Sequence, residues 1–178
     1  MNIFYLDKNP IKCARVHCDK HVVKMIIEYA QIMSTAHRVL DGQKYTDKTK
    51  NGRNITRWRH PNKDYDEFLY KATHVNHPST VWARQSRANY IWLYSMWREL
   101  CREYSYRYGK RHLTDQKLRS VLFKPPQNIP VTDFTDPPQA MPIDVHCQDT
   151  ITAYRNYYRT YKNTIAKWTR RQAPRFMQ

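Results

Sequence analysis

The segment from His17 to Arg38 constrains the fold of this chain more than any other, because its polar and apolar residues separate on a helix. At 100° of rotation per residue, the polar side chains fall on one narrow side. They are His17, His21, Lys24, Glu28, Gln31, Thr35 and Arg38. The rest of the circumference, from Val22 to Ala36, is mostly apolar. A helix of this kind packs within the molecule, and its narrow polar stripe predicts the floor of a cleft.

The start of this helix is also marked in the sequence. Asn9 before Pro10 is the usual pattern of an N-cap followed by proline in the first helical turn. The helix is expected to run to about Leu40. A break is expected near Cys18, after which Asp19 could cap a second helical segment.

Other segments predict further helices and the fold class. Apolar and aromatic residues recur at spacings of three and four before Gly109, a natural helix end. Later helices are expected over residues 113–123 and from Asp149 onward through the tyrosine-rich residues 154–168. Residues 41–64 predict a long basic loop, and residues 124–143 a proline-rich connection that cannot be helical. With only three glycines, we expect an all-α fold: a single domain over residues 1–178, built as a bundle of three major helices.

The chain carries a large excess of positive charge. Its 31 Lys and Arg residues against 15 Asp and Glu residues give a net charge of +16. Self-repulsion destabilises such a chain, whereas counterion release favours contact with phosphates, so DNA is the expected partner. No apolar run is long enough to span a membrane and no signal peptide is evident. We expect a cytoplasmic monomer whose four cysteines are reduced.

Glu28 is the one carboxylate in the polar stripe and the leading candidate for a catalytic group. His21 lies two turns away, about 10 Å along the helix axis. In one interpretation Glu28 is catalytic and His21 positions groups or transfers protons. In the other, Lys24 and Glu28 form an ordinary helix pair that contributes only about 0.2–0.5 kcal/mol.

A metal site is a second interpretation of the same helix. Cys13, His17 and His21 repeat every four residues, so they could meet a zinc ion if the helix is continuous. Strong zinc patterns pair two close-spaced couples of Cys or His, and a second couple is missing here. We therefore expect neither a metal nor another cofactor.

A second group of candidate residues surrounds the start of the next long helix. Arg84 and Arg87 are expected to contact phosphates near free backbone N–H groups. Trp82 either stacks on an exposed base or lies in the core. The predicted DNA-binding residues are Lys24, Gln31, Arg57, Asn76, His77, Trp82, Arg84 and Arg87.

Two stretches, "CDKHVVKMIIEYAQ" and "NHPSTVWARQSRANYIWLYSMWRELCREY", resemble the phage pyrimidine-dimer DNA glycosylase family of the endonuclease V type. That family is all-helical, and its first helix carries Asp-x-His with a catalytic Glu seven residues after the His. Asp19, His21 and Glu28 match this register. The resemblance implies an enzyme that acts on a base flipped out of the DNA stack.

The sequence also departs from that family. Its members attack the sugar with the amine of an N-terminal threonine, whereas here Met1 precedes Asn2, so the strand-nicking lyase step is not expected. The arginines just before and three residues after the family's Glu correspond here to Ile27 and Gln31. Substrate contacts are therefore expected to differ.

These observations predict a phage-type DNA glycosylase, a hydrolase of DNA repair or base modification in which Glu28 stabilises a sugar cation or activates water. Two alternatives stay open. One is a transferase that modifies hypermodified thymine in DNA, which the resemblance suggests more faintly. The other is a basic DNA-binding protein without enzymatic activity, which explains the charge equally well and requires nothing of Glu28.

Overall fold

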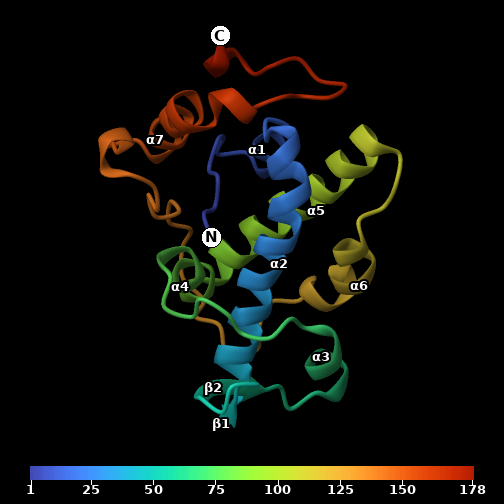
Figure 1. Cartoon of the computed structure of the whole chain (residues 1–178). Helices are drawn as coiled ribbons and strands as arrows, with labels where there is room; N and C mark the ends of the chain where they lie inside the picture. The colour runs from blue at the N-terminus through green and yellow to red at the C-terminus, as the bar shows by residue number, and fades with distance from the viewer.

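The computed structural model describes residues 1–178 and places one long helix at the centre of the molecule (Figure 1). The α-helices are α1 (Pro10–Arg15), α2 (Asp19–Asp41), α3 (Lys63–Phe68), α4 (Pro78–Gln85), α5 (Arg87–Tyr108), α6 (Leu113–Leu122) and α7 (Thr150–Tyr157). Strands β1 (Gln43–Lys48) and β2 (Asn54–Arg59) pair antiparallel between α2 and α3. A π-helical turn covers Tyr158–Lys162, and short 3-10 turns cover Ile143–Val145, Asn163–Ile165 and Arg175–Met177.

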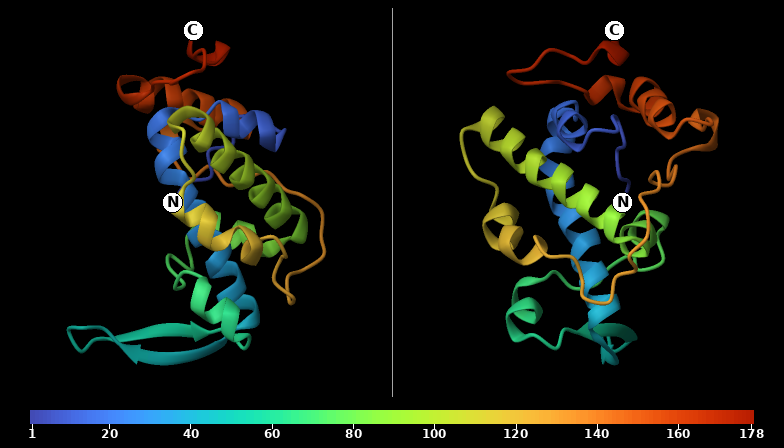
Figure 2. Two further views of the ribbon diagram at one scale, coloured as in Figure 1. Left: turned by 90° about the vertical axis from the view of Figure 1, so that its right-hand side faces the viewer. Right: turned by 180° about the vertical axis from the view of Figure 1, so that it is seen from behind.

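The central helix is α2, as its apolar circumference predicts. It packs against α4, α5 and α6, and α5 crosses it obliquely (Figure 2). At this crossing the Trp97 indole N–H donates to the Ile26 carbonyl at 2.9 Å. The break near Cys18 is confirmed, because α1 ends at Arg15 and α2 begins at Asp19.

The predicted loop over residues 41–64 is wrong, and so is the all-α fold class, because this segment forms a β-hairpin. The pairing runs from Gln43 opposite Arg59 to Lys48 opposite Asn54. Gly52 in the connecting turn has φ +73°, a left-handed conformation that glycine adopts without strain. Figure 2 shows the hairpin projecting from the helices at one end of α2. Every residue of β1 is exposed, so the strand lacks the alternation of apolar residues that marks a half-buried strand.

The bundle of three major helices is also not found, since seven α-helices are present and α7 is short. After α7 the chain continues through the π-helical turn and a 3-10 turn to Ile165, and residues 167–169 then contact the start of α2. The backbone N–H of Asp19 donates to the Lys167 carbonyl at 2.8 Å, and the Trp168 indole donates to the Val16 carbonyl at 3.0 Å. These contacts replace a continued helix.

Several local predictions are confirmed. The Asn9 side chain accepts N–H groups at the start of α1, and α5 ends at Gly109 in the left-handed conformation. The proline-rich connection predicted over residues 124–143 contains no α-helix, and a short 3-10 turn begins at its last residue, Ile143. All four cysteines are free thiols, and no helix is both long and apolar enough to span a membrane.

Candidate active-site pocket and basic cleft

Glu28 lies in a pocket of about 210 Å³ between α2, the start of the chain and the segment after α7. This Glu28 pocket is lined by Met1, Asn2, Phe4, His21, Lys24, Met25, Glu28, Tyr157 and Lys162. The side chain of Glu28 is 17% exposed, so it is neither in bulk solvent nor sealed from it. The structure therefore brings together both residues predicted to be catalytic.

Two lysines make the pocket basic around its single carboxylate. Lys24 pairs with Glu28 at 3.0 Å, but its side chain is 69% exposed and can reorient at little cost. Lys162 lines the pocket from the π-helical turn that follows α7, a separate element from α2. An anion bound here would meet cationic groups from two separate elements.

His21 is fixed in orientation and neutral at pH 7. Its Nδ1 hydrogen-bonds the Tyr158 hydroxyl at 2.5 Å, and its ring stacks on Phe4 with 4.1 Å between centroids. Burial, with smaller electrostatic contributions from His17, Lys162 and Lys24, lowers the His21 pKa to about 3. A neutral imidazole is a hydrogen-bonding and positioning group at pH 7 rather than a proton reservoir.

The two other groups near the start of α2 have structural roles. Asp19, the third residue of the resemblance, accepts hydrogen bonds from Arg107 at 2.8 Å and from Thr169. His17 is buried, with Nδ1 bonded to the Cys13 carbonyl at 2.7 Å and Nε2 to the Tyr29 hydroxyl at 3.0 Å. Both ring nitrogens of His17 are therefore occupied.

The alternative zinc site at Cys13, His17 and His21 does not form. The helix that it required ends at Arg15, and the Cys13 thiol bonds the Phe4 carbonyl at 3.2 Å. With the His17 nitrogens occupied as well, the three side chains do not converge on one point.

The C-terminal half of the polar stripe, from Gln31 to Arg38, is covered by residues 69–77. Gln31 is half-buried, and the Thr35 hydroxyl donates to the Thr73 carbonyl. Arg38 is buried and donates to the backbone carbonyls of Trp58, Asp66, Leu69 and Tyr70 and to the Asp66 carboxylate at 2.6 Å. The part of the stripe around Glu28 opens to the pocket described above, whereas Arg38 lines a smaller one at the root of the hairpin.

A larger basic cleft of about 710 Å³ lies between the hairpin and the covering segment. Its lining residues are Lys44, Ile55, Thr56, Arg57, Trp58, Lys71, Ala72, Thr73, His74, Val75 and Asn76. This basic cleft includes two of the predicted DNA-binding residues, Arg57 and Asn76. The Arg57 Nε is buried without a hydrogen-bond partner.

His77 directly follows Asn76, which lines the basic cleft. Its side chain caps α4 by accepting the Ser79 N–H at 3.2 Å. Burial lowers the His77 pKa, and the Glu28 carboxylate acts in the opposite sense.

The other predicted DNA-binding residues, Trp82, Arg84 and Arg87, differ in burial and in the contacts that they make. Trp82 is 4% exposed, donates to the Thr135 carbonyl at 2.9 Å and packs edge-on against Trp92 and Phe134, so it belongs to the core. Arg84 donates to the Val75 carbonyl at 2.7 Å and so holds the covering segment. Arg87 is exposed at the start of α5.

Several residues that line the Glu28 pocket or the basic cleft could not be predicted from any pattern in the sequence. Phe4, Tyr157 and Lys162 reach the Glu28 pocket only because both ends of the chain fold back on α2. Lys71 and His74 reach the basic cleft because Arg38, Thr35 and Arg84 hold their segment. Periodicity within one helix cannot predict such contacts.

No protein-family model matches the chain, and no curated protein and no solved structure matches it either. The resemblance to the glycosylase family therefore stays a prediction.

Proposed function

We propose that this protein is a DNA glycosylase-like enzyme that acts on a modified or damaged base flipped out of DNA. The observation that carries the proposal is the half-buried Glu28 carboxylate in a small basic pocket, in a molecule that also has a larger basic cleft between the hairpin and residues 71–76. Glu28 is the one carboxylate in this pocket, which also contains two lysines, in a protein with a net charge of +16. Such a group in a pocket is a candidate for catalysis.

The charges suit the chemistry of glycosidic bond cleavage. As the bond from sugar C1′ to the base nitrogen breaks, its electron pair leaves with the base and positive charge develops on the sugar. A carboxylate next to C1′ stabilises that charge, or takes the proton of a water whose oxygen then bonds C1′. The departing base gains a proton, for which Lys24 and Lys162 in the pocket lining are candidate donors.

The size of the pocket favours a single base or sugar over a whole oligonucleotide. Its volume of about 210 Å³ is below the roughly 300–1,000 Å³ of pockets for drug-sized ligands. The basic cleft, at about 710 Å³, would then hold the adjoining phosphates. Flipping costs a few kcal/mol, and contacts along the cleft and the hairpin would offset it.

The test is a comparison of Glu28→Gln with wild type on normal, ultraviolet-treated and hypermodified phage DNA. Mass spectrometry of nucleosides, free bases and abasic sites is the measurement. We expect wild type to release a free base, and Glu28→Gln to lose at least about 100-fold in rate while still binding DNA. Glu67→Gln, which removes an exposed carboxylate of α3, is the matched control and should act as wild type does.

Other outcomes separate the alternatives. A mass change on a base that stays in the DNA would identify a transferase in place of a glycosylase. Equal binding by both proteins, with no product on any of the three substrates, would leave only a DNA-binding protein and contradict the proposal.

A further inference from the structure

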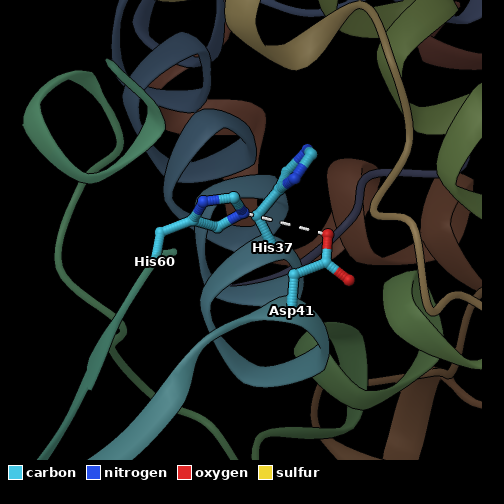
Figure 3. Close-up of side chains that lie close together, drawn as sticks. All are labelled: His37, Asp41 and His60. Atoms are coloured by element: carbon cyan, nitrogen blue, oxygen red, sulfur yellow. Dashed lines mark ion pairs between the residues drawn. The ribbon is translucent and has the colours of Figure 1, made fainter. Parts of the chain in front are cut away.

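Three side chains with metal-binding atoms converge at the base of the hairpin, away from the Glu28 pocket. His37 and Asp41 are one turn apart near the end of α2, and His60 directly follows β2. One ligand atom from each lies within 4.8 Å of the others. Figure 3 shows the three side chains close together, with a dashed line between His60 and Asp41. The distance from His60 Nε2 to the nearer Asp41 oxygen is 3.9 Å.

Two of these atoms are buried without a partner in the protein, which is costly for polar groups. They are His37 Nδ1 and His60 Nε2. Both residues are almost fully buried, at 1% and 8% exposure. Polar atoms in this situation usually bind a water or an ion.

The surrounding hydrogen bonds leave a lone pair on His37. Its Nε2 bonds the Tyr90 hydroxyl at 2.9 Å, and that hydroxyl donates its own proton to the Leu122 carbonyl. Nε2 must therefore carry the ring proton, and Nδ1 is the unprotonated nitrogen that a metal requires.

Asp41 and His60 are held in place by groups outside the cluster. The Asp41 carboxylate accepts the backbone N–H groups of Gln127 and Asn128 at 2.8 and 2.9 Å. The His60 ring stacks on Tyr65 at 5.0 Å. Its Nδ1 accepts a long 3.2 Å bond from the Asn62 N–H, which would be lost when metal binding at Nε2 moves the ring proton to Nδ1.

We propose that His37, Asp41 and His60 bind one divalent transition metal ion of the zinc class. Two imidazoles and one carboxylate form a donor set that Zn²⁺ prefers, with a fourth position left for water. Bond lengths of about 2.0–2.2 Å require the three atoms to draw together by roughly 1 Å. The ion would join the end of α2, the end of β2 and, through Asp41, residues 127–128.

The test is metal binding by the full chain after chelator treatment and dialysis, with Co²⁺ and Zn²⁺ as probes. We expect one Co²⁺ per chain with the strong visible absorption of a four-coordinate ion, and its displacement by Zn²⁺. Zn²⁺ at 100 times its Kd should raise Tm by about 5–10 °C.

The variants His60→Gln and Asp41→Asn should weaken Co²⁺ binding by more than about 100-fold. His146→Gln removes an exposed histidine elsewhere and should leave it unchanged. The proposal is overturned if wild type shows no saturable binding, or if the two ligand variants bind as tightly as wild type.

Should a ligand variant fail to fold by circular dichroism, histidine ring NMR of wild type decides the question. Zn²⁺ should then shift the ring signals of His37 and His60 and leave those of His146 in place. Shifts confined to other histidines would overturn the proposal.

Discussion

Glu103 is a buried carboxylate that joins three parts of the chain through two arginines. Arg171 donates to both its oxygens at 2.9 Å, and Arg107 donates to one at 2.8 Å and also to Asp19. Burial alone would raise the Glu103 pKa, but these arginines hold it below its usual value. The side chain of Arg107 is fully buried, so its positive charge needs the carboxylates of Glu103 and Asp19 as partners.

Replacement of Glu103 should therefore destabilise the fold strongly. We expect Glu103→Gln to lower the free energy of unfolding by about 3 kcal/mol, because the buried Arg107 charge loses a partner. Urea unfolding followed by circular dichroism measures the change. Glu67→Gln, at an exposed position, should stay within about 0.5 kcal/mol of wild type. A Glu103→Gln midpoint equal to that of wild type would contradict this expectation.

Loss of Glu28 should lower the free energy of unfolding much less than loss of Glu103. Its partner Lys24 is mostly exposed, and exposed pairs contribute about 0–1 kcal/mol. Loss of Glu28 should therefore leave the fold intact, so that an effect on base release can be assigned to chemistry. This separation is what makes Glu28→Gln a usable test.

At the scale of elements, the hairpin concentrates positive charge far from the core. It carries Lys44, Lys48, Lys50, Arg53, Arg57 and Arg59. Removal of three of these charges at its tip, in Lys48→Gln, Lys50→Gln and Arg53→Gln together, should lower the slope of log K against log salt concentration by about 3. Fluorescence anisotropy of a labelled duplex at several salt concentrations gives the slope.

A charge-matched control tests whether the hairpin itself binds DNA. The triple change Lys12→Gln, Lys110→Gln and Lys124→Gln removes three exposed lysines from outside the hairpin. We expect this control to change the slope by less than 1. Equal losses from both triple variants would mean that DNA responds only to net charge.

The elements also show what the sequence can predict. Local signals worked where the structure depends on neighbours in the chain, as at Asn9 before α1 and at Gly109 after α5. They failed for β1, whose exposed residues show no alternation, and after Tyr157, where α7 gives way to π and 3-10 turns and residue 167 then contacts Asp19. Such contacts join residues far apart in sequence, so no local pattern records them.

The candidate site likewise contains some residues that the sequence could predict and others that it could not. Glu28 and His21 share a face of α2, so helical periodicity was enough to bring them together. Lys162 reaches the same pocket from the other end of the chain, and the partners of His37 and Asp41 include His60 beyond the hairpin. For Trp82, composition could not distinguish a core position from an exposed one.

At the scale of the whole molecule, buried neutral histidines make stability depend on pH. Burial lowers the pKa of His17 to about 4 and of His21 to about 3, against about 6.5 in an unfolded chain. Below pH 6.5 the unfolded state therefore binds protons that the folded state does not. Stability is fully present above that pH and should fall as pH drops toward 4, by up to about 1.4 kcal/mol per unit for each histidine.

Urea unfolding at pH 7.5, 6.0 and 5.0 measures this dependence. His21→Gln should make the decline shallower, because Gln has no proton to gain, whereas His146→Gln should leave it unchanged. A free energy of unfolding that stays constant from pH 7.5 to 5.0 would show that the two rings are not held neutral.

Arg38 fixes the root of the hairpin on the same rigid helix that carries Glu28, ten positions earlier in the chain. At 1.5 Å per residue these two points are about 15 Å apart along the axis. For a DNA substrate that interval equals about four nucleotide steps at 3.4 Å each. Under the proposed function, α2 would fix the number of nucleotides between the one that reacts at Glu28 and the phosphates bound at the root of the hairpin.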